Sequence, residues 1–173
     1  MAVISLYGVG APLPEVEEET EKVLSKKFRL EPRFEGLIPP DATLSRGSQL
    51  LADVQLSRIL SLKPKDALFA GGLTPYDIYS GNLNFVFGIA LPFKGFLVSY
   101  ARLLSDDREL FLSRVRKEVT HEMGHVFGLP HCPDPKCVMH FSNSLIDTDL
   151  KGEEFCPSCK RKLEEAMAKL GLL

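Results

Sequence analysis

Residues 121–131 read His121-Glu122-Met123-Gly124-His125-Val126-Phe127-Gly128-Leu129-Pro130-His131, and the rest of the chain can be interpreted outward from this run. Positions four apart on an α-helix differ by about 40° of rotation, so His121 and His125 project from one face. Gly128 permits a sharp turn and Pro130 prevents the helix from continuing. The chain can therefore reverse and present His131 from another direction, which predicts that three imidazoles meet at one point.

The residue types in this run suit a zinc ion. Two imidazoles one helical turn apart can both reach a Zn²⁺ at Zn–N distances of about 2.0–2.1 Å, and a third from His131 leaves one coordination position open, as in catalytic sites. Glu122 lies about 100° round the helix from His121, so it is not placed as a ligand but can reach a water on the metal. We therefore predict hydrolysis by zinc-activated water with Glu122 as the general base.

The cysteines and histidines are confined to the same region. All four histidines lie between positions 121 and 140, and all four cysteines lie between positions 132 and 159. Cys132 and Cys137 are separated by four residues, and Cys156 and Cys159 by two, which fits a closed site of four thiolates around a structural zinc. Two disulfides, a redox C-x-x-C pair and a nucleic-acid-binding zinc ribbon remain open as alternatives.

The combined motifs carry a resemblance to a known family. The run from His121 to His131 resembles the signature of the metzincin zinc endopeptidases, which also have a downstream methionine in a tight turn, here Met139. Cys132 directly follows His131, and the stretch through Met139 to Cys159 resembles the archaemetzincins. This resemblance implies a metzincin-like fold, peptide-bond hydrolysis, and a second zinc held by the four cysteines. It covers residues 121–159 and is specific there.

Three positions bear on how this chain compares with other metzincins. Some metzincins have a tyrosine two positions after the turn methionine, whereas this chain has Phe141, so any hydrogen-bond donor to the transition state must come from elsewhere. His140 is a candidate neighbour of the site, although a histidine that supports the site indirectly or lies at the surface is the favoured alternative. The stretch from Leu83 to Leu91 is expected at the rim of the cleft as an edge strand, which could bind an extended peptide. An interior strand is the alternative.

The order of apolar patterns predicts an α+β fold, with a mixed β-sheet, backing and active-site helices, and an irregular C-terminal part with a closing helix. The expected strands are 2–7, 29–35, 67–70, 83–91 and 96–104, and the expected helices are 15–28, 48–62, 106–129 and 157–170. We expect an N-terminal subdomain over residues 1–128 and a C-terminal subdomain over residues 129–173, which together make one catalytic domain. Residues 133–155 have no long periodic run.

The amino-acid composition limits the kinds of partner that are expected for this chain. Hydrophobic residues make up 45% of the chain and the formal net charge is −2, which gives no electrostatic reason to expect binding to nucleic acid or anionic membranes. No apolar run reaches the roughly 18 residues that a transmembrane helix needs, and no export signal is recognised. We expect a cytoplasmic monomer that acts on peptides. The rival interpretations are a peptide-binding zinc protein with weak turnover and a nucleic-acid-binding zinc protein.

Overall fold

The computed structural model describes residues 1–173 and centres on one five-stranded sheet. The strand order is β2-β1-β4-β7-β6, in which the first four strands are parallel and β6 pairs antiparallel with β7 at the edge. The strands are β1 (Val3–Val9), β2 (Glu31–Ile38), β4 (Ala67–Thr74), β6 (Gly88–Leu91) and β7 (Gly95–Ser99). A separate parallel pair joins β3 (Leu50–Leu51) to β5 (Ile78–Tyr79). The predicted mixed sheet is confirmed.

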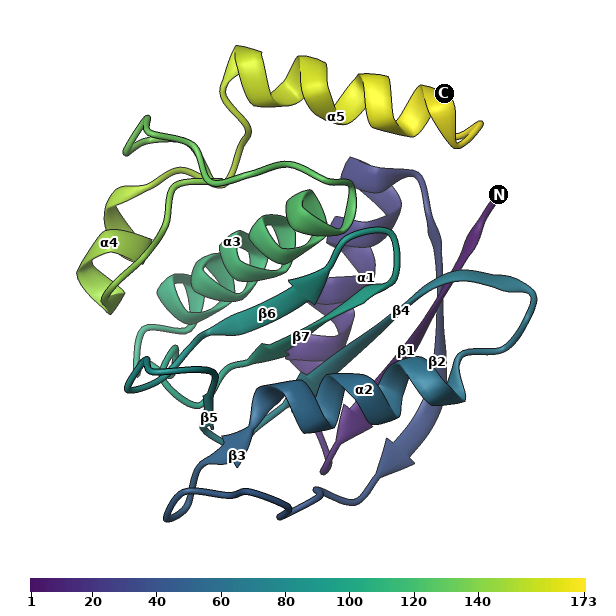
Figure 1. The fold of residues 1–173 in the computed structure, drawn as a ribbon. Helices are drawn as coiled ribbons and strands as arrows, with labels where there is room; N and C mark the ends of the chain where they lie inside the picture. The colour runs from purple at the N-terminus through teal and green to yellow at the C-terminus, as the bar shows by residue number, and fades with distance from the viewer.

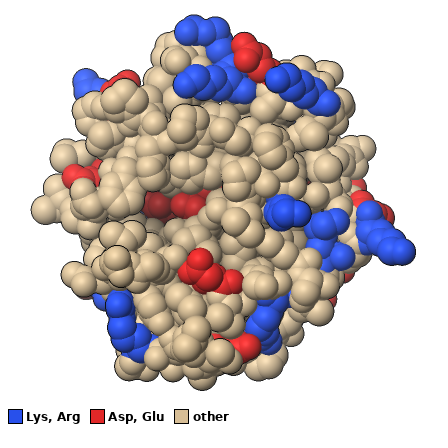
Figure 2. All heavy atoms as spheres, viewed as in Figure 1, with Lys and Arg blue, Asp and Glu red and all other residues tan.

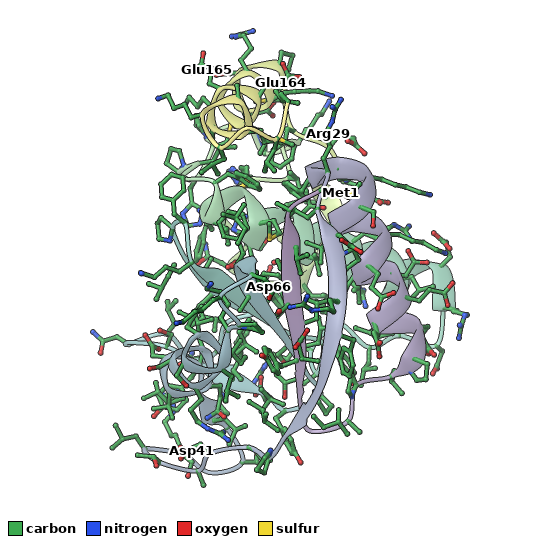
Figure 3. The ribbon with its side chains drawn as sticks, turned by 90° about the vertical axis from the view of Figure 1, so that its right-hand side faces the viewer. Met1, Arg29, Asp41, Asp66, Glu164 and Glu165 are labelled. Atoms are coloured by element: carbon green, nitrogen blue, oxygen red, sulfur yellow. The ribbon has the colours of Figure 1, made fainter.

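Helices cover both faces of this sheet (Figure 1). Helices α1 (Pro14–Phe28) and α3 (Arg108–Val126) pack side by side on one face, and α2 (Ala52–Leu62) packs on the other. Figure 3, viewed from the side, places α1 and α2 on opposite sides of the strands. The sheet has an apolar core on each face, and successive residues of an inner strand alternate between them. In β1, Ile4 and Leu6 face α1 and α3, while Tyr7 and Val9 face α2. Both faces of β1 are therefore buried, which explains its apolar run.

The active-site helix α3 begins where the sequence offers a cap. The Asp107 side chain accepts a hydrogen bond from the Leu110 amide, which satisfies one of the free donors in the first turn. The helix ends at Val126, and Gly128 follows with a φ of 88°, a left-handed conformation that glycine adopts without strain. The position at which α3 ends is thus determined by the residues around Gly128, as the motif predicted.

The C-terminal part contains α4 (Leu145–Leu150), which lies beside α3, and α5 (Pro157–Lys169) (Figure 1). Helix α4 is held on α3 by charged side chains. Arg114 donates two hydrogen bonds to the Asp149 carboxylate, at 2.8 and 2.9 Å, and Lys117 donates to the Thr148 carbonyl at 3.0 Å. These contacts fix a segment that buries little apolar surface, since Ile146 and Leu150 stay exposed.

Several elements differ from the predicted ranges. The expected strand over 67–70 continues through two glycines to Thr74, and the expected strand over 96–104 ends at Ser99. The expected helix over 48–62 starts as the short strand β3 and becomes helical only at Ala52. The expected strand over 83–91 is regular only from Gly88, because Ile78 and Val86 form an isolated bridge just before it. Helix α4 was not predicted, since six residues capped by Ser144 are too few to show an apolar period.

None of the helices combines the length and the apolar character that a membrane crossing requires.

The Arg114–Asp149 pair predicts how acid affects stability. The hydrogen bonds from Arg114 hold the pKa of Asp149 below its usual range. A depressed pKa in the folded state contributes stability that is present above about pH 4 and is lost as the pH falls through the lower, folded-state pKa. Asp149→Asn should therefore lower the free energy of unfolding at pH 7 by about 1–2 kcal/mol, because the nearly buried Arg114 loses its charged partner.

Urea denaturation from pH 7 down to pH 2 measures this effect. The stability difference between wild type and Asp149→Asn should shrink as the pH falls. Glu165→Gln is the control, because Glu165 is an exposed residue of α5 that makes no ion pair (Figure 3). A difference that stays constant across this range would contradict the assignment of the effect to the Asp149 charge.

Candidate active site

Three imidazoles converge at the C-terminal end of α3. His121 and His125 face the same way from successive turns, and their Nε2 atoms lie 3.2 Å apart. His131 reaches them from the segment beyond Gly128, with its ring centre 5.3 Å from that of His121 and 4.8 Å from that of His125. One nitrogen from each ring lies within 4.8 Å of the other two. The predicted return of the chain to His131 is therefore present in the structure.

Backbone carbonyls orient two of these rings. The Nδ1 of His121 lies 2.8 Å from the Val138 carbonyl oxygen, and the Nδ1 of His125 lies 2.7 Å from that of Leu129. Since a carbonyl can only accept, each Nδ1 is the donor and each Nε2 keeps a free lone pair. Burial lowers the pKa of all three histidines, and for His121 the charge of Lys151 lowers the pKa further. Neutral imidazoles with free lone pairs are the form that binds a metal.

The donor set fits zinc. Ligands at the Zn–N distance of a tetrahedral site lie about 3.3 Å from one another, close to the 3.2 Å between His121 and His125. Glu122 supplies a second observation. Its Oε1 lies 3.9 Å from the His121 Nε2, and its Oε2 is buried with no hydrogen-bond partner. Burial raises the pKa of Glu122 well above its usual value, and the nearby Glu118 raises it further.

The four cysteines form a second cluster. Their sulfurs lie within 4.8 Å of one another, and the Sγ atoms of Cys132 and Cys156 are 3.8 Å apart. A disulfide would need about 2.05 Å, whereas sulfurs around a tetrahedral zinc lie about 3.8 Å apart. Amide groups also point at the sulfurs, since the Cys156 amide donates to Cys137 Sγ at 3.3 Å and the Cys159 amide to Cys156 Sγ at 3.5 Å. The cysteines are free in the structure, and their arrangement suits a closed metal site.

Met139 packs against Gly124, a residue for which the sequence predicted no role. A Cβ on Gly124 would lie 2.3 Å from the Met139 Sδ, so the methionine packs directly on the helix backbone between His121 and His125. Met139 is fully buried. A glycine inside a helix lowers helix stability by about 1 kcal/mol relative to alanine. The presence of Gly124 in the helix could therefore have indicated that another side chain packs closely on the helix backbone there.

The two residues after Met139 border the site. His140 places its Nδ1 2.8 Å from the Cys132 carbonyl oxygen, so it bonds to the backbone of the segment that follows His131. The Phe141 ring lies 5.1 Å from the His131 ring. His140 is thus a neighbour of the site, and Phe141 offers no hydrogen-bond donor.

A cavity of about 430 Å³ opens onto the histidines. Residues 83–90 form one wall, and α3 with Phe141, Ser142 and Asn143 forms the other. Figure 2 shows a hollow in this face with acidic atoms inside it, and the acidic residues that line the cavity are Glu118 and Glu122. Strand β6 is the edge of the sheet and touches Glu122, since a Cβ on Gly88 would lie 2.9 Å from the Glu122 Cγ. The prediction of an edge strand at the rim is confirmed for residues 88–91.

Sequence reasoning missed Glu118 and Lys151. Glu118 is one helical turn before Glu122, a spacing that could have marked it. Lys151 follows α4 in a stretch without periodicity, so no sequence signal pointed to it.

The packing of Met139 on Gly124 can be tested with three variants. Gly124→Ala should lower the free energy of unfolding by about 1–3 kcal/mol despite the higher helix propensity of alanine, because the added methyl group overlaps Met139. Met139→Ala should cost about 2–5 kcal/mol through the cavity that it leaves. The double variant should cost less than the sum, since the shorter side chain at position 139 makes room for the methyl group added at position 124. Urea denaturation measures all three, and strict additivity would contradict the contact.

Comparisons with known proteins agree with this arrangement. The profile of Peptidase family M54 matches residues 44–165. The archaemetzincin of Pyrococcus furiosus is 42% identical over 178 residues, which cover 91% of this chain and 92% of that protein. The crystal structure of archaemetzincin from Methanopyrus kandleri superposes with a TM-score of 0.88 at 36% identity, covering 96% of both chains.

The archaemetzincin of Archaeoglobus fulgidus, complexed with malonate, gives a TM-score of 0.81 at 33% identity over 92% of this chain and 99% of that one. Family profile, relatives and solved structures all agree with the motif from which the sequence analysis began. The chain therefore belongs to Peptidase family M54, the archaemetzincins, and is a zinc metallopeptidase.

Proposed function

We propose that His121, His125 and His131 hold the catalytic zinc and that Glu122 is the general base of peptide hydrolysis. The observation that carries this assignment is the convergence of three free imidazole nitrogens beside the unpartnered, buried Oε2 of Glu122. When bound, zinc polarises the substrate carbonyl and makes a water more acidic. Glu122 takes the proton of the attacking water at its carboxylate and later passes it to the leaving amine.

The substrate strand is assigned to the free edge of β6. One side of β6 pairs with β7, and the other side borders the cavity. An extended peptide can add to such an edge through backbone hydrogen bonds, which hold the peptide without regard to its side chains. The contact between Gly88 and Glu122 then places the general base next to the bound backbone.

We assign Cys132, Cys137, Cys156 and Cys159 to a structural zinc, which makes two zinc ions per chain. The segment between the cysteine pairs buries few apolar side chains beyond Val138 and Met139, and metal binding can supply folding free energy to such a segment. Cys132 directly follows His131, so this site also fixes the chain next to the third histidine. Gly128 and Met139 support the histidines from the turn and from below.

The setting of the enzyme is also part of the proposal. The net charge of −2 and the separate basic side chains around the face in Figure 2 favour a peptide over a nucleic acid as the partner. The proposal also includes that the enzyme is a monomer in the cytoplasm. The cavity lies between residues of the 1–128 part and of the 129–173 part, which favours the two-subdomain division. Family membership favours turnover over the weak peptide-binding alternative.

Metal analysis tests the two sites separately. Wild-type protein should contain about two zinc ions per chain, of which a chelator removes the more exposed, histidine-bound one first. His121→Ala with His125→Ala should leave about one ion, and Cys156→Ser with Cys159→Ser should remove the other and destabilise the chain. A wild-type content of one ion that is lost in the histidine variant would refute the cysteine site.

The role of Glu122 is tested by Glu122→Gln. The variant should cleave a peptide library about 10²–10⁴-fold more slowly, because the amide cannot accept the proton of water. Its zinc content should remain that of wild type, since Glu122 is not a ligand in this assignment. Glu164→Gln, a change on the exposed face of α5, is the control (Figure 3). Full activity of Glu122→Gln would contradict the assignment.

A further inference from the structure

A lysine without any solvent exposure lies behind the active site. The side chain of Lys151 is 0% exposed, and its Nζ lies 3.5 Å from the Glu118 Oε1. Glu118 is itself only 3% exposed and accepts a hydrogen bond from the Thr148 hydroxyl at 3.2 Å. Removing two charges from water costs several kcal/mol for each ion, and a buried pair often stabilises a fold no better than apolar residues do. Folding stability alone therefore does not explain why this pair is here.

The location of the pair points to the active site. Glu118 lies one helical turn before Glu122 and on the same face of α3, and both line the cavity. No lysine or arginine lines this cavity. The Lys151 ammonium group nevertheless contacts Glu118, and its charge lowers the pKa of Glu122 and of all three histidines.

Lys151 also holds the turn that carries Met139. Its Nζ donates a hydrogen bond of 3.2 Å to the carbonyl oxygen of His140, the residue after Met139. The His140 ring in turn bonds to the Cys132 carbonyl, and the Cys132 amide donates to the Met139 carbonyl at 3.0 Å. Cys132 follows His131 directly. A continuous set of contacts therefore runs from Glu118 on α3 through Lys151 and His140 to the backbone next to His131.

The residues around Lys151 keep it in place. Lys117 bonds to the Thr148 and Asp149 carbonyls, at 3.0 and 3.3 Å, and Arg114 bonds to the Asp149 carboxylate. These contacts anchor α4 to α3, and Lys151 comes directly after α4. The backbone of Lys151 is therefore held in place, and its ammonium group lies between α3 and the turn that carries Met139.

We propose that Lys151 and Glu118 are positioning residues for peptide hydrolysis, which fix the Met139–His140 turn, and with it His131, relative to His121 and Glu122 on α3. The pair does not touch the substrate in this proposal. It sets the distance between the two elements that supply the zinc ligands. This inference rests on the proposed assignment of the three histidines.

The test separates positioning from stability with a double variant. Lys151→Met leaves the Glu118 charge without its partner, so both stability and zinc affinity at the histidine site should fall. Lys151→Met with Glu118→Gln removes both charges, and its urea midpoint should recover toward that of wild type. Zinc affinity at the histidine site, measured by competition with a chromophoric chelator, should remain about 10–100-fold weaker, because the His140 carbonyl still lacks its donor.

Two single variants serve as references. Leu56→Ala opens a cavity in the separate apolar core between α2 and the sheet, on the face opposite α3, so it should lower stability while zinc affinity at the histidine site stays within about twofold of wild type. Glu118→Gln keeps an oxygen that can accept from Lys151 and should weaken zinc less than Lys151→Met does. For the double variant, kcat on a peptide substrate should fall while KM changes little, since the β6 edge is untouched.

Two results would overturn the proposal. The first is a double variant, or a Lys151→Met protein, that binds zinc at the histidine site as tightly as wild type. The second is a Leu56→Ala protein that loses zinc affinity at the histidine site as strongly as Lys151→Met, because the loss would then follow stability alone. Failure of the histidine assignment looks different, since His121→Ala would then leave the zinc content of the otherwise wild-type chain unchanged.

Discussion

The hydrogen bond from the His121 ring to the Val138 carbonyl joins the two parts of the chain on which everything else depends. It connects the long helix α3, which the sheet holds in place, to a segment that has no apolar period. The same bond fixes which nitrogen of His121 faces the cavity. The Met139 side chain, one residue further on, packs on Gly124 and leaves the helix and the turn little freedom to separate. The relative positions of the three imidazoles therefore depend on this hydrogen bond and on the packing of Met139.

Charge is distributed unequally over the two faces of α3. Toward the sheet the helix presents apolar residues such as Val115 and Val119, which join the main core. Toward the C-terminal part it presents Arg114, Lys117 and Glu118, all of them buried and all paired with residues of 148–151. The α4 segment is thus docked on α3 mainly by ion pairs and hydrogen bonds, whereas Val138, Met139 and Leu163 of the C-terminal part join the main apolar core. Ion pairs and hydrogen bonds are directional, so they hold α4 and the chain next to it at a defined angle. Apolar packing alone would define that angle less sharply.

The sequence predicted the structure best where the residues that carry the chemistry also have a spacing that determines the local backbone. The helix through His125, the turn at Gly128 and the return to His131 all follow from spacing, so the three histidines could be predicted to converge. The inner strands were recognisable because β1 and β4 are buried on both faces and read as apolar runs. Helix α4 and Lys151 could not be found in this way, because long-range charged contacts fix them and such contacts leave no period in the sequence. The close approach at Gly124 likewise depends on Met139, which lies fifteen positions further along the chain.

The contact between Gly88 and Glu122 has a consequence for where a bound peptide would be cut. Because Gly88 has no side chain to separate it from the Glu122 carboxylate, this carboxylate lies at a fixed position along the edge strand. A peptide paired with an antiparallel edge can shift only in whole residues of about 3.4 Å, and its hydrogen-bonding pattern repeats every second residue. Only one alignment brings a given carbonyl level with Glu122. Under the proposed function, backbone pairing therefore limits cleavage to positions at regular spacing along the peptide, and side-chain contacts choose among these positions.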